Sequence, residues 1–171
     1  MHFISDLTYK VVAYTVVPDF NTDLCVDWAV EMMALGYESE NLFILAGLSK
    51  PTNYFETINY LQKALAELGL QVKQGEDGIA SYSYYYVKRI VQRKAVKQNL
   101  EKLKDYVFSN GLYDMIYDFY SLYWAWSDLE EGYMHYYWDG ATLDNIEHLV
   151  VDRARQWIVE HELKYIQAAY K

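Results

Sequence analysis

Residues 105–152 read DYVFSNGLYDMIYDFYSLYWAWSDLEEGYMHYYWDGATLDNIEHLVVD, and aromatic and acidic side chains dominate this stretch. It contains ten Asp and Glu residues but no Lys or Arg, together with 13 of the 30 aromatic residues of the chain. Residues 88–104, directly before it, have the opposite charge, with seven of the 15 basic residues and a single acid, Glu101. This segregation marks where the polar chemistry of the protein is concentrated.

Apolar side chains recur at helical spacing through this stretch and decide the fold class. Between residues 112 and 126 they occupy two neighbouring faces of one helix, formed by Leu112, Ile116, Phe119, Tyr123 and Trp126 and by Tyr113, Tyr117, Tyr120 and Trp124. A helix that is apolar around so much of its circumference is expected to be central. Helical spacing in the other segments predicts an all-α fold of six to eight helices, arranged as a helical bundle or as a short α-α superhelix.

Local signals predict where several other helices begin and end. Ser39 and Asn53 precede helical segments, and each is expected to accept a hydrogen bond from a free N–H group of the first turn. Thr142 is the expected cap of the last helix. Residues 79–108 form either one long helix or two joined helices, and a rotation of the apolar stripe predicts a bend or break near residues 92–95.

The segment at residues 3–17 is compatible with two secondary structures. Its apolar residues from Ile4 to Tyr14 keep helical spacing, whereas the β-branched run VVAYTVV favours a strand. We prefer a helix that ends at Pro18.

The length of 171 residues predicts a single domain over residues 1–171, and the candidate for a minor division is the polar loop at residues 70–78. No uncharged apolar run approaches the ~18 residues of a membrane span, and the N-terminus lacks the basic and apolar regions of a signal peptide. The single cysteine, Cys25, excludes an internal disulfide framework. These features predict a cytoplasmic protein without a membrane partner.

The net charge of −9 predicts which classes of partner the protein binds. Such a surface repels nucleic acid and anionic membranes and attracts a basic protein. The sequence also lacks a Gly-rich phosphate loop, a Gly-x-Ser-x-Gly elbow and a Cys-x-x-Cys pair. These absences argue against the commonest enzyme classes, and we expect neither a cofactor nor a bound metal.

Residues 36–48, GYESENLFILAGL, resemble a segment of an uncharacterised family of bacterial helical proteins. The shared pattern is Gly-Tyr-x-Ser-x-x-Leu followed by Ile-Leu-Ala-Gly-Leu, and its first part is matched by Gly36, Tyr37, Ser39 and Leu42. The resemblance implies a helical fold and carries over no activity and no functional residue.

A constellation of Arg and Asp residues is the first candidate for polar chemistry. Arg89 and Arg93 are spaced one helical turn apart, and Asp114 and Asp118 form a second such pair on the predicted central helix. We expect these charges to pair across the helical hairpin, because buried charges need partners. The alternatives are a polar cleft that binds a ligand and a pair of catalytic carboxylates.

The histidines and the cysteine give weaker signals for chemistry. His148 has Asp144 and Asp152 one turn to either side, and we interpret this face as solvated and salt-bridged rather than as a metal site. His161 falls in the apolar stripe of the last helix, which predicts a core histidine. Cys25 lies in a predicted helix with no neighbouring base, which predicts a buried and unreactive thiol.

The acidic aromatic segment after the central helix is the second candidate site. Tyr and Trp in a loop beside carboxylates are typical of interface hot spots. The candidate binding residues are Glu130, Glu131, His135, Tyr136, Tyr137, Trp138 and Asp139. The other interpretation of these aromatic residues is that they cover the end of the helical core.

Two classes of function remain open from the sequence. The first is a non-catalytic, acidic interaction protein, such as an inhibitor, an immunity-type protein or an adaptor, that binds a basic partner. The alternative is a helical protein that binds a small ligand or metal, or a hydrolase, using Asp114 and Asp118 with Arg89 and Arg93.

Overall fold

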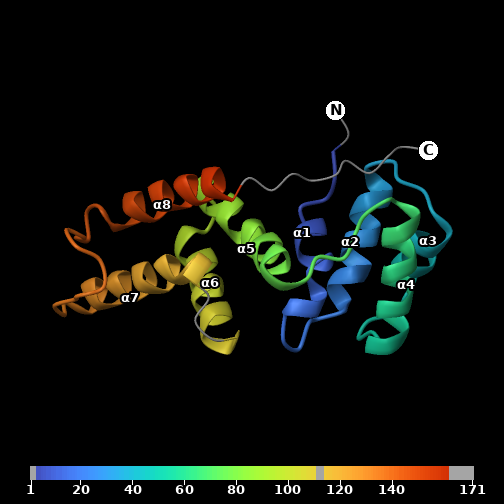
Figure 1. Cartoon of the computed structure of the whole chain (residues 1–171), viewed down its shortest axis with the longest axis horizontal. Helices are drawn as coiled ribbons and strands as arrows, with labels where there is room; N and C mark the ends of the chain where they lie inside the picture. Colours follow the sequence, from blue (N-terminus) through green and yellow to red (C-terminus); the bar gives the residue numbers. More distant parts are fainter. Residues whose placement is uncertain (1–2, 111–113, 162–171) are drawn as a thin grey trace. The chain divides into compact units, whose positions relative to one another are not determined.

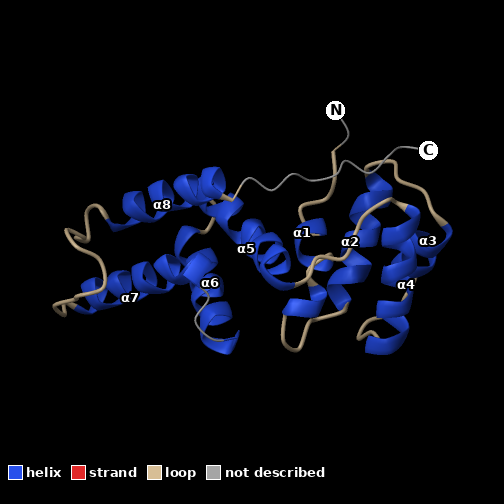
Figure 2. Ribbon diagram, viewed as in Figure 1, coloured by secondary structure: helices blue, strands red, loops and turns tan. Residues whose placement is uncertain are grey.

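The computed structural model describes residues 3–110 and 114–161, and these ranges contain helices and loops but no strand (Figure 2). Eight α-helices and two short 3-10 helices follow one another along the described chain (Figure 1). The all-α prediction is therefore confirmed. The chain divides into two compact units, with a boundary between Tyr82 of unit 1 and Ser83 of unit 2. This boundary lies inside helix α5 (Gly75–Val91), a few residues after the loop at 70–78 that was the predicted division.

Unit 1 contains five helical elements before α5. They are α1 (Thr8–Val11), the 3-10 helix η1 (Tyr14–Val16), α2 (Asp23–Ala34), α3 (Glu40–Ala46) and α4 (Tyr54–Glu67). The segment at residues 3–17, ambiguous from its sequence, is thus helical where it is regular. Helix α2 packs against α3, and α3 packs against α4. The side chain of Ser39 accepts a hydrogen bond from the Leu42 N–H and that of Asn53 from the Glu56 N–H, so both predicted caps are confirmed.

Helix α2 is held in unit 1 by polar contacts as well as by its buried face. Trp28 has no exposed surface, and its indole N–H donates a hydrogen bond of 2.9 Å to the Thr8 hydroxyl. On the exposed side, the Asp23 carboxylate accepts hydrogen bonds from the backbone N–H of Thr52, at 2.8 Å, and from its hydroxyl, at 2.9 Å. These two hydrogen bonds lower the pKa of the Asp23 carboxyl.

Unit 2 contains the second part of α5 and four further elements. They are α6 (Val96–Asn110), the 3-10 helix η2 (Asp114–Ile116), α7 (Tyr117–Glu131) and α8 (Ile146–Glu160). Helix α6 packs against α7, and α8 contacts both. The predicted break near residues 92–95 is confirmed, because α5 ends at Val91 and α6 begins at Val96.

Helix α7 provides much of the core of unit 2. Phe119, Leu122 and Ala125 have no exposed surface, and the Phe119 ring lies against Trp157 of α8 with 6.4 Å between ring centroids. The second predicted apolar face is less buried, because Tyr117 is exposed and Trp124 is half-buried. Residues 112 and 113 of the predicted helix lie outside the described ranges. No described helix is long and apolar enough to cross a membrane.

The start of α8 differs from the prediction. Asn145, and not Thr142, is the residue before the first helical turn. The Asn145 carboxamide accepts a hydrogen bond of 2.7 Å from the Thr142 N–H and donates one of 3.0 Å to the Gly140 carbonyl oxygen. The prediction of Thr142 as cap was wrong because the Asn145 side chain closes one further turn of the loop before the helix begins.

Candidate functional site

The connection between α7 and α8, residues 132–145, is called the aromatic loop below. It begins where α7 ends at Gly132, whose φ of 77° lies in the left-handed region that glycine adopts without strain. The Gly132 N–H donates to the Leu129 carbonyl oxygen and the Tyr133 N–H donates to that of Asp128, at 3.2 and 2.8 Å. These two bonds satisfy carbonyl groups at the end of α7 and fix the direction in which the loop leaves the helix.

Side chains inside the aromatic loop hold it together. The His135 Nε2 atom lies 3.1 Å from the carbonyl oxygen of the buried residue Ala141, and its Nδ1 atom is buried. The Tyr136 hydroxyl donates to the Met134 sulfur at 3.3 Å. Together with the Asn145 contacts, these bonds give the loop a defined conformation.

Large apolar side chains of the aromatic loop face solvent. The exposed fractions are 63% for Tyr133, 80% for Met134, 87% for Tyr136, 48% for Tyr137 and 58% for Leu143. Trp138 is half-buried. Of the predicted candidates, Tyr136 and Tyr137 are therefore accessible to a partner, and Trp138 is less so. Tyr133 and Met134 lie within the acidic aromatic segment predicted as a contact surface but were not among its named candidates, and Leu143 lies beyond that segment.

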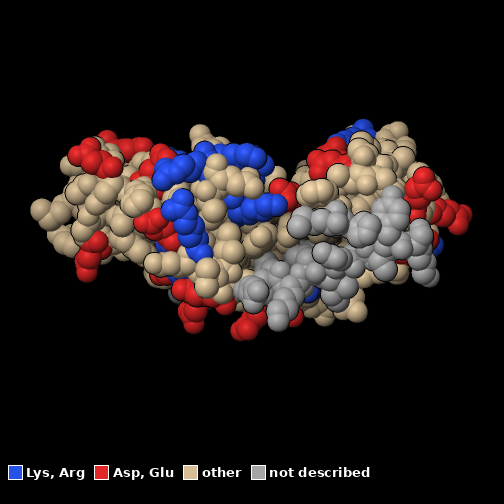
Figure 3. All heavy atoms as spheres, turned by 90° about the horizontal axis from the view of Figure 1, so that it is seen from above, with Lys and Arg blue, Asp and Glu red and all other residues tan. Residues whose placement is uncertain are grey.

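The carboxylates around the aromatic loop fall into two groups. Glu130 pairs with Lys97 of α6, whereas Glu131, Asp139 and Asp144 are exposed and form no ion pair within the described residues. In the space-filling view, acidic side chains border the end of unit 2 that carries the loop, and Lys and Arg side chains gather farther along (Figure 3). Glu131 and Asp139 are thus exposed within a few residues of exposed aromatic rings, whereas Glu130 already pairs with Lys97.

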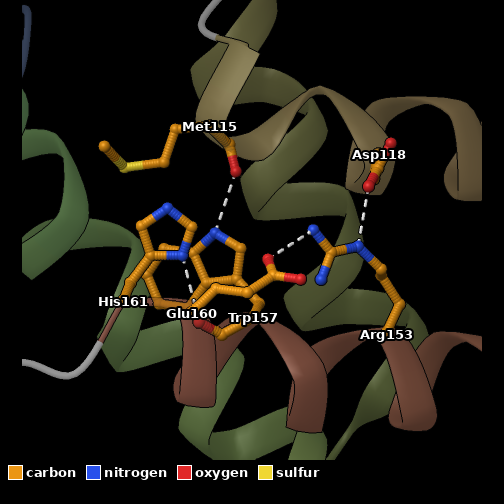
Figure 4. Close-up of polar contacts among 6 residues, drawn as sticks. All are labelled: Met115, Asp118, Arg153, Trp157, Glu160 and His161. Atoms are coloured by element: carbon orange, nitrogen blue, oxygen red, sulfur yellow. Dashed lines mark hydrogen bonds and ion pairs between the residues drawn. The ribbon is translucent and has the colours of Figure 1, made fainter.

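The predicted Arg and Asp pairs are replaced by other pairs. Asp118 is bound by Arg153 of α8, whose Nε atom lies 2.7 Å from a carboxylate oxygen, and the same guanidinium binds Glu160 at 2.9 Å (Figure 4). Arg93 binds Glu147 at 3.3 Å, and the Arg89 guanidinium lies 5.5 Å from the centre of the Tyr85 ring. Asp114 is exposed at the start of η2. The four predicted residues therefore do not form one network.

The Arg153 network ties α8 to the start of α7. Burial lowers the pKa of Arg153, but its hydrogen bonds to Asp118 and Glu160 outweigh this effect, so the net shift is upward. One turn later, the indole N–H of Trp157 donates a hydrogen bond of 2.9 Å to the Met115 carbonyl oxygen (Figure 4). Arg153 was missed from the sequence, although its spacing from Trp157 places it beside the buried stripe of α8.

The predicted histidines and the cysteine make contacts within the fold and are not grouped into a site. His148 pairs with Asp152 at 2.9 Å on an exposed face, as expected. His161 is half-buried and stacks on the Trp157 ring with 4.5 Å between centroids. Its Nδ1 atom lies 3.0 Å from the backbone carbonyl oxygen of Trp157. Cys25 is buried, and this burial raises the pKa of its thiol from 9.0 to about 12. Within residues 3–110 and 114–161, no three His, Cys, Asp or Glu side chains are grouped as metal ligands.

Comparison with family models, with curated proteins and with solved structures gave no match to this chain. The resemblance at residues 36–48 therefore remains a prediction. In the structure this segment begins just after α2 and spans α3.

Proposed function

We propose that this protein is a non-catalytic interaction protein that binds a basic protein partner through the aromatic loop and its flanking acids. The observation that carries the proposal is the combination, in and beside one loop, of exposed aromatic side chains with carboxylates that form no ion pair among the described residues. Its binding surface consists of Tyr133, Met134, Tyr136 and Tyr137 with Glu131, Asp139 and Asp144.

The first argument comes from the exposed apolar surface. Tyr136, with 87% of its surface exposed, and Met134, with 80%, are adjacent in space because the tyrosine hydroxyl contacts the methionine sulfur. Contiguous exposed apolar groups with a polar rim are typical of interaction sites, and Tyr and Met are enriched in protein interfaces. The internal bonds of the loop support this role, because an ordered loop loses less conformational entropy when it binds.

The second argument comes from the placement of the acids. The last turn of α7 contains Glu130 and Glu131 and no basic residue. Carboxylates at a helix C-terminus face the negative end of the helix dipole, which costs about 0.3–1 kcal/mol each at low ionic strength. Residues that work against local stability are expected at functional positions.

The third argument is that Lys side chains within unit 2 already lie beside carboxylates and aromatic rings. The Lys97 ammonium pairs with the Glu130 carboxylate and lies 5.9 Å from the centre of the Trp126 ring. The Lys104 ammonium lies 4.6 Å from the centre of the Tyr123 ring. Carboxylates beside aromatic rings bind Lys and Arg by charge and by cation–π attraction. In the aromatic loop the same two groups are exposed, which favours a partner that presents basic side chains.

The alternative that uses Asp114 and Asp118 has less support. Asp118 is bound by Arg153, and Asp114 lies exposed at η2. Arg89 and Arg93 contact Tyr85 and Glu147 instead. No observation on these residues favours a ligand cleft or catalytic pair, so we do not propose one.

Site-specific photo-cross-linking tests the proposal. A benzophenone amino acid replaces Tyr136 in one variant and Phe55, which is 82% exposed in unit 1, in the control. A basic protein captured in a host lysate by the first variant and not by the control is identified by mass spectrometry, purified and used for binding kinetics.

The kinetics of the purified complex then distinguish the two parts of the surface. The variant with Glu131→Gln, Asp139→Asn and Asp144→Asn should associate more slowly and with a weaker salt dependence, because charge steers association. Tyr136→Ala should speed dissociation, since truncated aromatic anchors commonly cost ~2 kcal/mol or more. A captured protein that is acidic, or one whose binding neither variant changes, would show the proposal to be wrong.

A further inference from the structure

We infer that Arg93 and Lys97 weaken the attraction of the binding surface for basic groups, because they neutralise Glu147 and Glu130, the acids next to the two ends of the aromatic loop. This inference rests on the proposed function. The two residues set how basic a partner must be in order to bind. They act as charge-tuning residues and make no contact with the partner themselves.

Lys97 neutralises the first end of the loop. It lies in the first turn of α6, and its ammonium pairs with Glu130, two residues before the loop starts. Without Lys97, the last turn of α7 would present two carboxylates, Glu130 and Glu131, that are both free to attract a cation. With it, Glu131 is the exposed acid of the last turn of α7 that is left for a partner at this end.

Arg93 neutralises the second end of the loop. It lies in the turn between α5 and α6, and its guanidinium binds Glu147 in the first turn of α8 at 3.3 Å. Its φ of 55° is left-handed, a conformation that glycine adopts at lower cost. Glycine at this position would bring no charge to Glu147. Arg93 in this turn and Lys97 in the first turn of α6 are four residues apart, so one short segment supplies both cations.

These contacts contribute little to folding but alter the electric field of the surface. The four side chains keep 34–53% of their surface exposed, and ion pairs with such exposure contribute only about 0–1 kcal/mol to stability. If each removed cation lies about 6 Å from a cation of the partner, removal of both should tighten binding about tenfold when salt screening is weak. At a Debye length of about 8 Å, near 150 mM salt, the gain should fall to about threefold.

The test uses a defined probe and a local readout. The probe is the peptide Lys-Leu-Arg-Lys-Leu-Arg-amide, titrated into the full chain at about 10 mM and about 150 mM salt, where screening differs strongly. Backbone amide NMR signals of residues 132–145 report binding at the loop itself and give its Kd, apart from peptide bound elsewhere on this acidic protein. The same spectra show whether each variant keeps the fold.

Two double variants should shift the Kd of the peptide in opposite directions. Arg93→Gln with Lys97→Gln should bind the peptide more tightly, by the factors given above. Glu130→Gln with Glu147→Gln leaves both cations unpaired and should bind it more weakly by a similar factor.

The matched control is Lys102→Gln. Lys102 is exposed on α6, carries the same charge as Lys97, and has no side-chain partner among the described residues. Its Kd should stay within about twofold of wild type, because its position on α6 lies well around the helix from Lys97.

The outcomes separate the inference from the proposed function. Loop binding that Tyr136→Ala abolishes, and that Arg93→Gln with Lys97→Gln strengthens, supports both. Loop binding with an unchanged Kd in that double variant, or with an equal gain in Lys102→Gln, overturns the inference and leaves the proposed function standing. Loop signals that do not respond to the peptide, or that respond equally after Tyr136→Ala, overturn both.

Discussion

Replacing Phe119 by Ala removes the ring at the centre of unit 2 and tests whether α7 is its core helix. Phe119 has no exposed surface, and its ring packs on Trp157 with 6.4 Å between centroids and 62° between planes. Truncation of a buried Phe costs about 3–5 kcal/mol, of which the aromatic pair itself contributes about 0.5–1.5 kcal/mol. Phe119→Leu keeps most of the apolar volume and should cost about 1.5 kcal/mol or less.

A matched control separates burial from the chemistry of the substitution. Phe108→Ala removes the same atoms from a side chain that is 80% exposed on α6, and should change the free energy of unfolding by about 0.5 kcal/mol or less. Urea unfolding is followed by tryptophan fluorescence, since four of the five Trp residues lie after Ser83 and report on unit 2. Equal losses in Phe119→Ala and Phe108→Ala would refute the assignment of α7 as the core helix.

Four further outcomes are expected. A double-mutant cycle of Arg153→Met with Asp118→Asn should give a coupling of about 0.5–1.5 kcal/mol, because Arg153 keeps only 15% of its side-chain surface exposed; purely additive losses in urea unfolding would contradict the pair. Because burial raises the pKa of the Cys25 thiol from 9.0 to about 12, thiol reagents at pH 8 should label the folded protein about a thousandfold more slowly than the unfolded one. Since the unfolded thiol deprotonates first, the stability of wild type relative to Cys25→Ala should fall as pH rises from 9.0 to about 12; a flat difference would show that the thiol is not buried. Asn53→Ala should cost about 1 kcal/mol in thermal unfolding, because its carboxamide accepts the Glu56 N–H at 3.1 Å, whereas Asn53→Ser should cost little.

In the candidate site, the sequence predicted which residues are exposed but not which ion pairs they form. Sequence reasoning placed Glu131, Tyr136 and Asp139 in a candidate binding surface, because Tyr and Trp in a loop beside carboxylates are typical of interface hot spots. It also assigned Glu130 to that surface, but Lys97 occupies this carboxylate. The partner of a surface acid depends on which helix lies beside it, and this is not encoded by neighbouring residues.

Features of single helices were determined by the sequence alone. The caps at Ser39 and Asn53 and the break at residues 92–95 depend on hydrogen bonds and backbone angles within a few residues. The burial of Phe119 follows from the 3.6-residue period of its helix, which the sequence displays directly.

The charge pairs were decided only by the tertiary structure. The sequence predicted Arg89 or Arg93 as the partner of Asp118, but the packing of α8 selects Arg153, 35 residues away. The start of the last helix after Asn145 and not Thr142 is, by contrast, a local feature that the prediction missed, because the Asn145 side chain donates to the Gly140 carbonyl oxygen only five residues away. The physical reason is the short range of hydrogen bonds and ion pairs: a partner is chosen within about 3–4 Å, whereas helical periodicity leaves the relative rotation and register of two helices open.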